Sequence, residues 1–227
     1  MLGDTPHIYR GQQIDPRVIF RSDPHLALTK IVSIPAGYGW LAPGTIMGCI
    51  SESTTRQGLF VPYAVQAPVA AMAFVPGAYL LQDGAASLEA HVSMEDSYKF
   101  AVGDHLGALD SDGAAGAVDL GAITAIDRST YATKAVITVT NNVTTGITVA
   151  KGGMIFIQTD TATPFTTAVG LLMHGVFTGA GENAQGGDGV LVISNAIVRK
   201  GVIPNYDAGA LADLPFAQVV NNDLIMR

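Results

Sequence analysis

The chain has few charged residues and a single cysteine, and each shortage excludes a class of protein. Charged residues make up 14% of the 227 positions, well below the usual quarter. A chain with so few charges hides much of its surface in a core or against partners, because interface cores are depleted in charge. Cys49 stands alone, which excludes an internal disulfide and a cysteine-based zinc site.

Basic residues and long apolar runs are also scarce. The 12 Lys and Arg residues stand against 19 Asp and Glu residues, for a net charge of −7. Binding to nucleic acid needs clustered basic residues to replace phosphate counterions, so we expect no nucleic-acid partner. No apolar run reaches about 18 residues without interruption, and we expect no membrane partner. The opening MLGDTPHIYRGQQ lacks the features of a signal peptide, which predicts synthesis in the cytoplasm.

Patterns that carry chemistry are missing as well. The Gly-rich stretch 179–189 has neither the preceding strand and following helix of a dinucleotide site nor the Lys of a phosphate loop. The DSDG sequence at 110–113 lacks the later oxygen ligands of a calcium loop. The five histidines are isolated, and Ser194 lacks the flanking glycines of a nucleophile elbow. We therefore predict no catalytic, cofactor-binding or metal-binding residues, no cofactor and no enzyme.

The residues that are abundant predict a mainly β fold with one or two short helices. The sequence WLAPGTIMGCI at 40–50 is typical of short strands punctuated by Gly and Pro turns. Between 75 and 161, strand-like runs recur every 8–12 residues, which predicts a small antiparallel barrel or sandwich. Two of these runs flank a turn at 127–130, and a further hairpin is expected around Gly146. Asp207 is a good N-cap for a helix of one or two turns.

Changes in texture divide the chain into three parts. Residues 1–25 contain two early prolines and little periodicity, which predicts an extended arm that another surface must order. Residues 26–74 and 162–227 share a Gly-rich, apolar texture and are expected to form one β core. Residues 75–161 are expected to form a β-domain inserted into that core.

Several separated segments of this core resemble one protein family. WLAPGTIMGCI (40–50) resembles the strand–turn–strand that opens the head decoration proteins of tailed bacteriophages, the lambda-type capsid-stabilising trimers. AVGLLMHGVFTG (168–179), GVLVISNAIVRKGVIP (189–204) and the closing LIMR (224–227) resemble the second half of that family. The resemblance covers residues 26–74 and 162–227, about half of the chain. The unit at 75–161 interrupts the family's compact domain.

The resemblance implies a virion structural protein, made in the host cytoplasm, that binds the capsid exterior as a homotrimer and stabilises the expanded head. Its implied partners are the major capsid protein and further copies of itself. The N-terminal arm then contacts the capsid, and the residues expected to do so are Tyr9, Arg10, Arg17 and Arg21. Tyr38 and Trp40 are expected at the subunit interface, a common place for aromatic residues.

Three alternatives stay open at this point. The middle β unit is compatible with an adhesion or glycan-binding module on the virion surface. Another head or capsid structural protein is a further reading, although the chain is short for the major shell protein. A small hydrolase would need an acid, a base and a nucleophile from distant segments, and nothing in the sequence indicates such a set.

Overall fold

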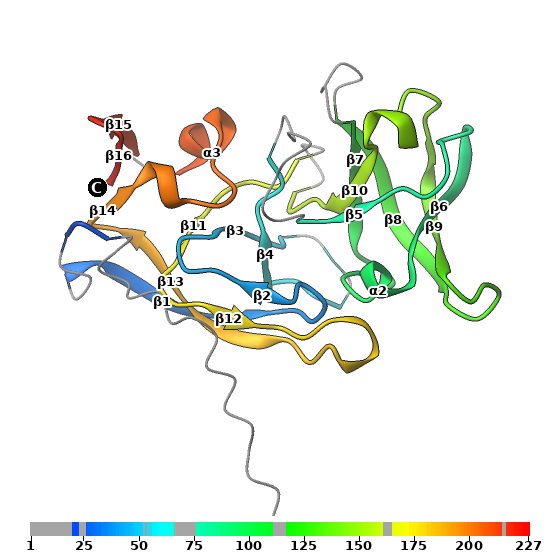
Figure 1. The fold of residues 1–227 in the computed structure, drawn as a ribbon, viewed down its shortest axis with the longest axis horizontal. Coiled ribbons are helices and arrows are strands. Elements are labelled where there is room, and N and C mark those ends of the chain that lie inside the picture. Colours follow the sequence, from blue (N-terminus) through cyan, green and yellow to red (C-terminus); the bar gives the residue numbers. More distant parts are fainter. Residues whose placement is uncertain are drawn as a thin grey trace, which may run out of the picture.

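The computed structural model describes residues 20–22, 26–51, 53, 55–65, 76–110, 117–160, 165–214 and 217–227. This part of the chain is mainly β with two short α-helices, as the sequence predicts. Figure 1 shows two groups of strands side by side along the long axis. We call residues 76–160 the barrel, and residues 20–65 together with 165–227 the base.

The base is built on a five-stranded antiparallel sheet. Its strands follow the spatial order β1 (Leu28–Ile34), β13 (Gly187–Ser194), β11 (Gly170–Leu172), β3 (Ile46–Cys49) and β4 (Phe60–Pro62). Strands from before the barrel therefore pair with strands from after it, as in the pairs β1–β13 and β11–β3. This interleaving fixes both ends of the barrel segment to one sheet.

The C-terminal segment covers one face of this sheet. It forms a three-stranded sheet in the order β14 (Ala196–Arg199), β16 (Asp223–Met226) and β15 (Gln218–Val220), together with helix α3 (Ala208–Asp213). Ile46 and Leu171 of the large sheet pack against Val198 of β14 in a shared apolar cluster. The predicted N-cap is confirmed, because the Asp207 carboxylate accepts a hydrogen bond from the Ala210 N–H at 2.7 Å.

The barrel is a nearly closed six-stranded antiparallel sheet. Its order is β5 (Ala78–Tyr79), β10 (Met154–Ile157), β7 (His105–Leu109), β8 (Val118–Asp127), β9 (Lys134–Val143) and β6 (Ser87–Ser93). The N–H of Leu81, just after β5, donates to the His91 carbonyl of β6 at 2.8 Å and so joins the two ends of the sheet. Closure of this kind leaves few free strand edges for other chains.

One apolar core extends through both parts. Its largest cluster joins Val32 and Leu172 of the base with Leu106 and Ile137 of the barrel. Strand pairing thus separates the two parts near the predicted boundaries, whereas the buried side chains connect them. The description of residues 75–161 as an inserted domain stays a prediction.

Short elements complete the junction between the parts. Helix α2 (Met94–Ser97) of the barrel lies close to the 3-10 turn η3 (Gly181–Asn183) of the base. At this junction a Cβ on Gly37 would lie 2.8 Å from the backbone nitrogen of Lys99, so the two backbones meet without room for a side chain. Two further 3-10 turns are η2 (Val149–Lys151) and η4 (Lys200–Val202). Within the described ranges, no helix is long and apolar enough to span a membrane.

Candidate interaction surface

The most deeply buried ion pair joins the barrel to the base. The guanidinium Nη1 of Arg56 lies 3.1 Å from Oδ2 of Asp104, whose side chain is completely buried. The Ser53 hydroxyl and the Ala101 N–H also donate to this carboxylate, at 3.1 and 2.7 Å. Burial raises the pKa of Asp104, and the nearby Arg56 partly opposes that rise. A carboxylate occupied by donors from both parts holds them together and is not available to a substrate.

The other ionisable groups of the described residues do not assemble into a reactive centre. Asp110 is buried at the end of β7, where the Lys151 ammonium lies 3.8 Å from it. Across the described part of the chain, no group of three or more His, Cys, Asp or Glu residues could hold a metal ion. The candidate site is therefore sought on the surface.

An exposed aromatic pair stands out on the base. Trp40 and Phe177 face each other across a two-stranded ribbon of β2 (Trp40–Leu41) and β12 (Val176–Phe177). They are 45% and 65% exposed, and directly opposed antiparallel residues lie on the same face. A Cβ on Gly175 would lie 2.2 Å from Cζ2 of Trp40, so the indole ring lies close against the backbone there. The pair is a fixed apolar surface that no other residue in the described ranges covers.

The outer strand β1 adds a second exposed apolar region. Leu28 and Ile31 of this end strand are 55% and 77% exposed, and Leu26, just before it, is 73% exposed. Edge strands are usually guarded by charged residues that discourage pairing with other chains. Lys30 is the cation of this strand, but its ammonium lies 5.3 Å from the ring centroid of Phe60 on β4. β1 and β4 are the two end strands of the sheet and lie close together, so the charge of Lys30 is directed toward β4 and not toward the exposed side chains of Leu28 and Ile31.

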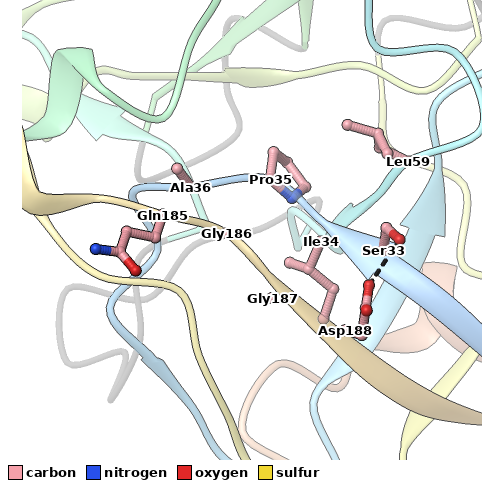
Figure 2. Close-up of a pocket in the computed structure, with 9 residues that line it drawn as sticks. All are labelled: Ser33, Ile34, Pro35, Ala36, Leu59, Gln185, Gly186, Gly187 and Asp188. Carbon is pink, nitrogen blue, oxygen red and sulfur yellow. Dashed lines mark hydrogen bonds between the residues drawn. The ribbon is translucent and has the colours of Figure 1, made fainter.

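A shallow groove lies where β1 ends, and Figure 2 shows its lining. It has a volume of about 420 Å³ and is lined by Ser33, Ile34, Pro35, Ala36, Leu59, Gln185, Gly186, Gly187 and Asp188. Polar side chains mark its two ends: the Ser33 hydroxyl donates to Asp188 at 2.7 Å at one, and Gln185 lies at the other (Figure 2). Gln185 also donates its N–H to the carbonyl of Thr178, the residue after Phe177. The groove and the aromatic pair are therefore neighbours.

Charge is divided unequally between the two parts. Residues 76–160 contain 10 Asp and Glu residues but 4 Lys and Arg residues, whereas the rest of the chain contains 9 and 8. Almost all of the net charge of −7 consequently belongs to the barrel segment. The base is nearly neutral and carries the most exposed apolar side chains, a combination suited to contact with other proteins.

The two predicted subunit-interface residues have different environments. Trp40 is exposed and available for the predicted contact, which stays a prediction. Tyr38 is 5% exposed, and burial raises its pKa. Its side chain belongs to the chain's own core, so the assignment of Tyr38 to a subunit interface is wrong. Gly39 has a φ of +64°, which breaks the strand alternation that would otherwise place residues 38 and 40 on one face.

The predicted capsid-contact residues lie mostly outside the described residues, namely Tyr9, Arg10 and Arg17. Arg21 is described: its N–H donates to the Ile197 carbonyl at 2.8 Å, and its side chain lies 3.0 Å from Asp223. Phe20 forms a β-bridge with Val198 and is buried. The end of the predicted arm is thus corrected, because residues 20–22 pack on the base of their own chain.

No pattern in the sequence marks Phe177 as a surface residue. It stands in GVFTG, where glycines on both sides hide any alternation, and its strand partner Trp40 lies far away in sequence. Comparison of the chain with protein-family models, with curated proteins and with solved structures finds no match. A proposal for the function of the chain therefore rests on its sequence, its fold and this surface.

Proposed function

We propose that the chain is a structural protein of a phage virion, which coats the capsid exterior as a trimer and stabilises the head. The observation that carries this proposal is the fixed aromatic pair Trp40–Phe177 on a nearly neutral base. An apolar surface of this kind is usually covered in an assembly. The resemblance of residues 26–74 and 162–227 to decoration proteins indicates that this assembly is a trimer on a capsid.

The division of charge supports one orientation on the shell. The acidic barrel faces solvent, where its negative charge keeps the coated particles apart. The base faces the capsid and the neighbouring copies, where few charges have to be desolvated. A trimer that spans several capsid subunits adds many weak contacts at high effective concentration and opposes outward pressure on the shell.

The anchor at residues 20–22 supports a role for the N-terminal segment in this attachment. Phe20 and Arg21 attach the C-terminal end of that segment to the edge of β14. Tyr9 and Arg10 precede this anchor in the sequence, and an extended segment can add a strand to an exposed sheet edge of a partner. We keep both residues as capsid contacts in the proposal.

Co-sedimentation with expanded phage heads tests this function. The full chain is expected to pellet with heads of the phage that encodes it and to saturate a fixed number of sites. A chain lacking residues 1–16 keeps the Phe20 anchor and is expected to remain trimeric but to lose most head binding. The proposal is wrong if the full chain stays in the supernatant at every concentration while the heads remain intact.

A further inference from the structure

We propose that the groove at the end of β1 receives Arg17-Val18-Ile19 from a neighbouring copy, so that the copies exchange their N-terminal segments. The inference rests on the self-association proposed above and names the contact that produces it. Its starting point is the groove of Figure 2, which is apolar along Ile34, Pro35 and Leu59 and carries the Asp188 carboxylate at one end.

The groove fits a short extended segment with one cation and adjacent apolar residues. Asp188 is exposed, and its Oδ1 accepts a hydrogen bond from Ser33. An Arg guanidinium presents several donors that match a carboxylate, so it fits this end of the groove. Pro35 is already buried in the chain, whereas Leu59 is half-buried, so the two apolar side chains would cover the part of Leu59 that still contacts water.

The N-terminal segment contains such a sequence directly before the anchored Phe20. Arg17-Val18-Ile19 supplies one cation followed by two β-branched residues, which favour extended backbone. Arg10, the other N-terminal arginine outside the described residues, is followed by Gly11 and two glutamines and lacks the apolar pair. The match in charge and apolar character therefore singles out residues 17–19.

The groove that they occupy must belong to another copy. Phe20 bridges to Val198, which follows the far end of β13, whereas the groove lies at Gly187, where β13 begins (Figure 1). A strand of this length spans roughly 25 Å. Three extended residues reach about 10 Å. Residues 17–19 cannot cross that distance along their own chain.

The contact is head-to-tail, because the Phe20 end of one copy meets the groove of the next. Such a contact uses two different surfaces of each chain and produces a closed ring when the rotation between copies is a simple fraction of a turn. This arrangement assigns Arg17 to the neighbouring copy and leaves Tyr9 and Arg10 for the capsid.

Charge exchange tests the contact in the full-length protein. Asp188→Lys and Arg17→Glu are each expected to weaken trimer formation by about tenfold or more, whereas the double variant restores it to within about threefold. Glu95→Lys makes the same change on an exposed barrel residue and is expected to leave association unchanged. Equal association of all four variants with the wild type in sedimentation experiments would overturn the inference.

Disulfide trapping provides a second readout that does not depend on the strength of association. Two proteins are mixed under mild oxidation, one carrying Val18→Cys and the other Gln185→Cys, both in a Cys49→Ser background. The expected product is a covalent dimer of one chain of each kind, seen on a denaturing gel without reductant. Leu88→Cys on the barrel replaces Gln185→Cys as the control and is expected to give no such product.

The outcomes separate this inference from the proposed function. A wild-type protein that neither self-associates nor binds heads contradicts both. A wild-type trimer that ignores the charge changes and yields no mixed disulfide contradicts the exchange of residues 17–19 alone. Rescue by the double charge variant together with the mixed disulfide supports the exchange of residues 17–19, and head binding by the same wild-type protein supports the proposed function.

Discussion

The base and the barrel differ in how their end strands meet: β1 and β4 of the base lie close together without strand pairing, whereas a hydrogen bond joins the ends of the barrel sheet. The barrel joins its end strands through the Leu81–His91 hydrogen bond and surrounds its core with an acidic exterior. The base leaves β1 at the edge of its sheet, with Ile31 77% exposed and Lys30 directed toward β4. In the proposed assembly the barrel faces solvent, and the exposed apolar side chains of the base are covered by other proteins.

This difference exists within one continuous core. Arg56 from the base and Asp104 from the barrel form a buried pair, and Gly37 lets the two backbones meet. A self-sufficient barrel would not need such a junction. We therefore regard the barrel as a rigid extension of the base, and the first predictions concern the junction between them.

The largest effect is expected from Arg56→Met, which leaves Asp104 buried without its cation. Breaking a buried pair from one side costs about 3–5 kcal/mol in the free energy of unfolding. Urea denaturation measures this loss. Adding Asp104→Asn to the same chain is expected to recover a large part of it, because the neutral amide needs no counter-charge. A single variant within about 1 kcal/mol of the wild type would mean that the pair does not hold the junction.

Gly37→Ala tests the close approach of the two backbones. Its φ of +100° and the 2.8 Å distance to the Lys99 nitrogen are both unfavourable for a side chain, and we expect a loss of about 3 kcal/mol. Gly58→Ala is the matched control, because Gly58 also has a positive φ, of +84°, but has no atom within 4 Å of the added Cβ. About 1 kcal/mol is expected there. Equal losses in thermal unfolding would show that contact with the barrel adds nothing.

Trp40→Ala tests whether the exposed surface of the base, and not that of the barrel, mediates association. Removing a central aromatic residue from an interface weakens association by about 2 kcal/mol, or roughly 30-fold. Stability of the isolated chain should change little, since Trp40 is already 45% exposed. Leu88→Ala, on the barrel and 44% exposed, should alter neither quantity. Sedimentation equilibrium distinguishes the two, and equal behaviour would remove Trp40 from the interface.

The smallest expected effect is on pH dependence. Burial raises the pKa of Asp104 above its ordinary 3.8, so the folded state keeps this proton to higher pH than the unfolded chain. Stability from this group is therefore lost as pH rises from 3.8 through the raised value. Hydrogen bonds from Thr130 and Ser129 lower the pKa of Asp127, whose contribution is instead lost as pH falls below 3.8. Carboxyl NMR titrations should show the two groups on opposite sides of 3.8.

Sequence reasoning identified features that depend on local chemistry. The mainly β character follows from short β-branched runs between Gly and Pro turns, and Asp207 caps a short helix as its residue type indicates. The two strand runs around the turn at 127–130 became β8 and β9. Each of these features is determined by residues a few positions apart.

Features that depend on tertiary contacts were missed. The expected hairpin around Gly146 is wrong, because β9 ends at Val143 and pairs with β8 and β6. The following residues form a turn instead, in which Gly84 donates its N–H to the Ile147 carbonyl. The groove could not be predicted from the sequence either, since it is formed by residues 33–36, Leu59 and 185–188 from distant parts of the chain.

Light scattering on the purified full chain tests most directly whether the base is an association surface. We predict a concentration-dependent approach to three times the chain mass of 23.5 kDa, and a shift toward a single chain for Trp40→Ala but not for Leu88→Ala. A constant mass of one chain at every concentration, for the wild type and both variants alike, would contradict the account.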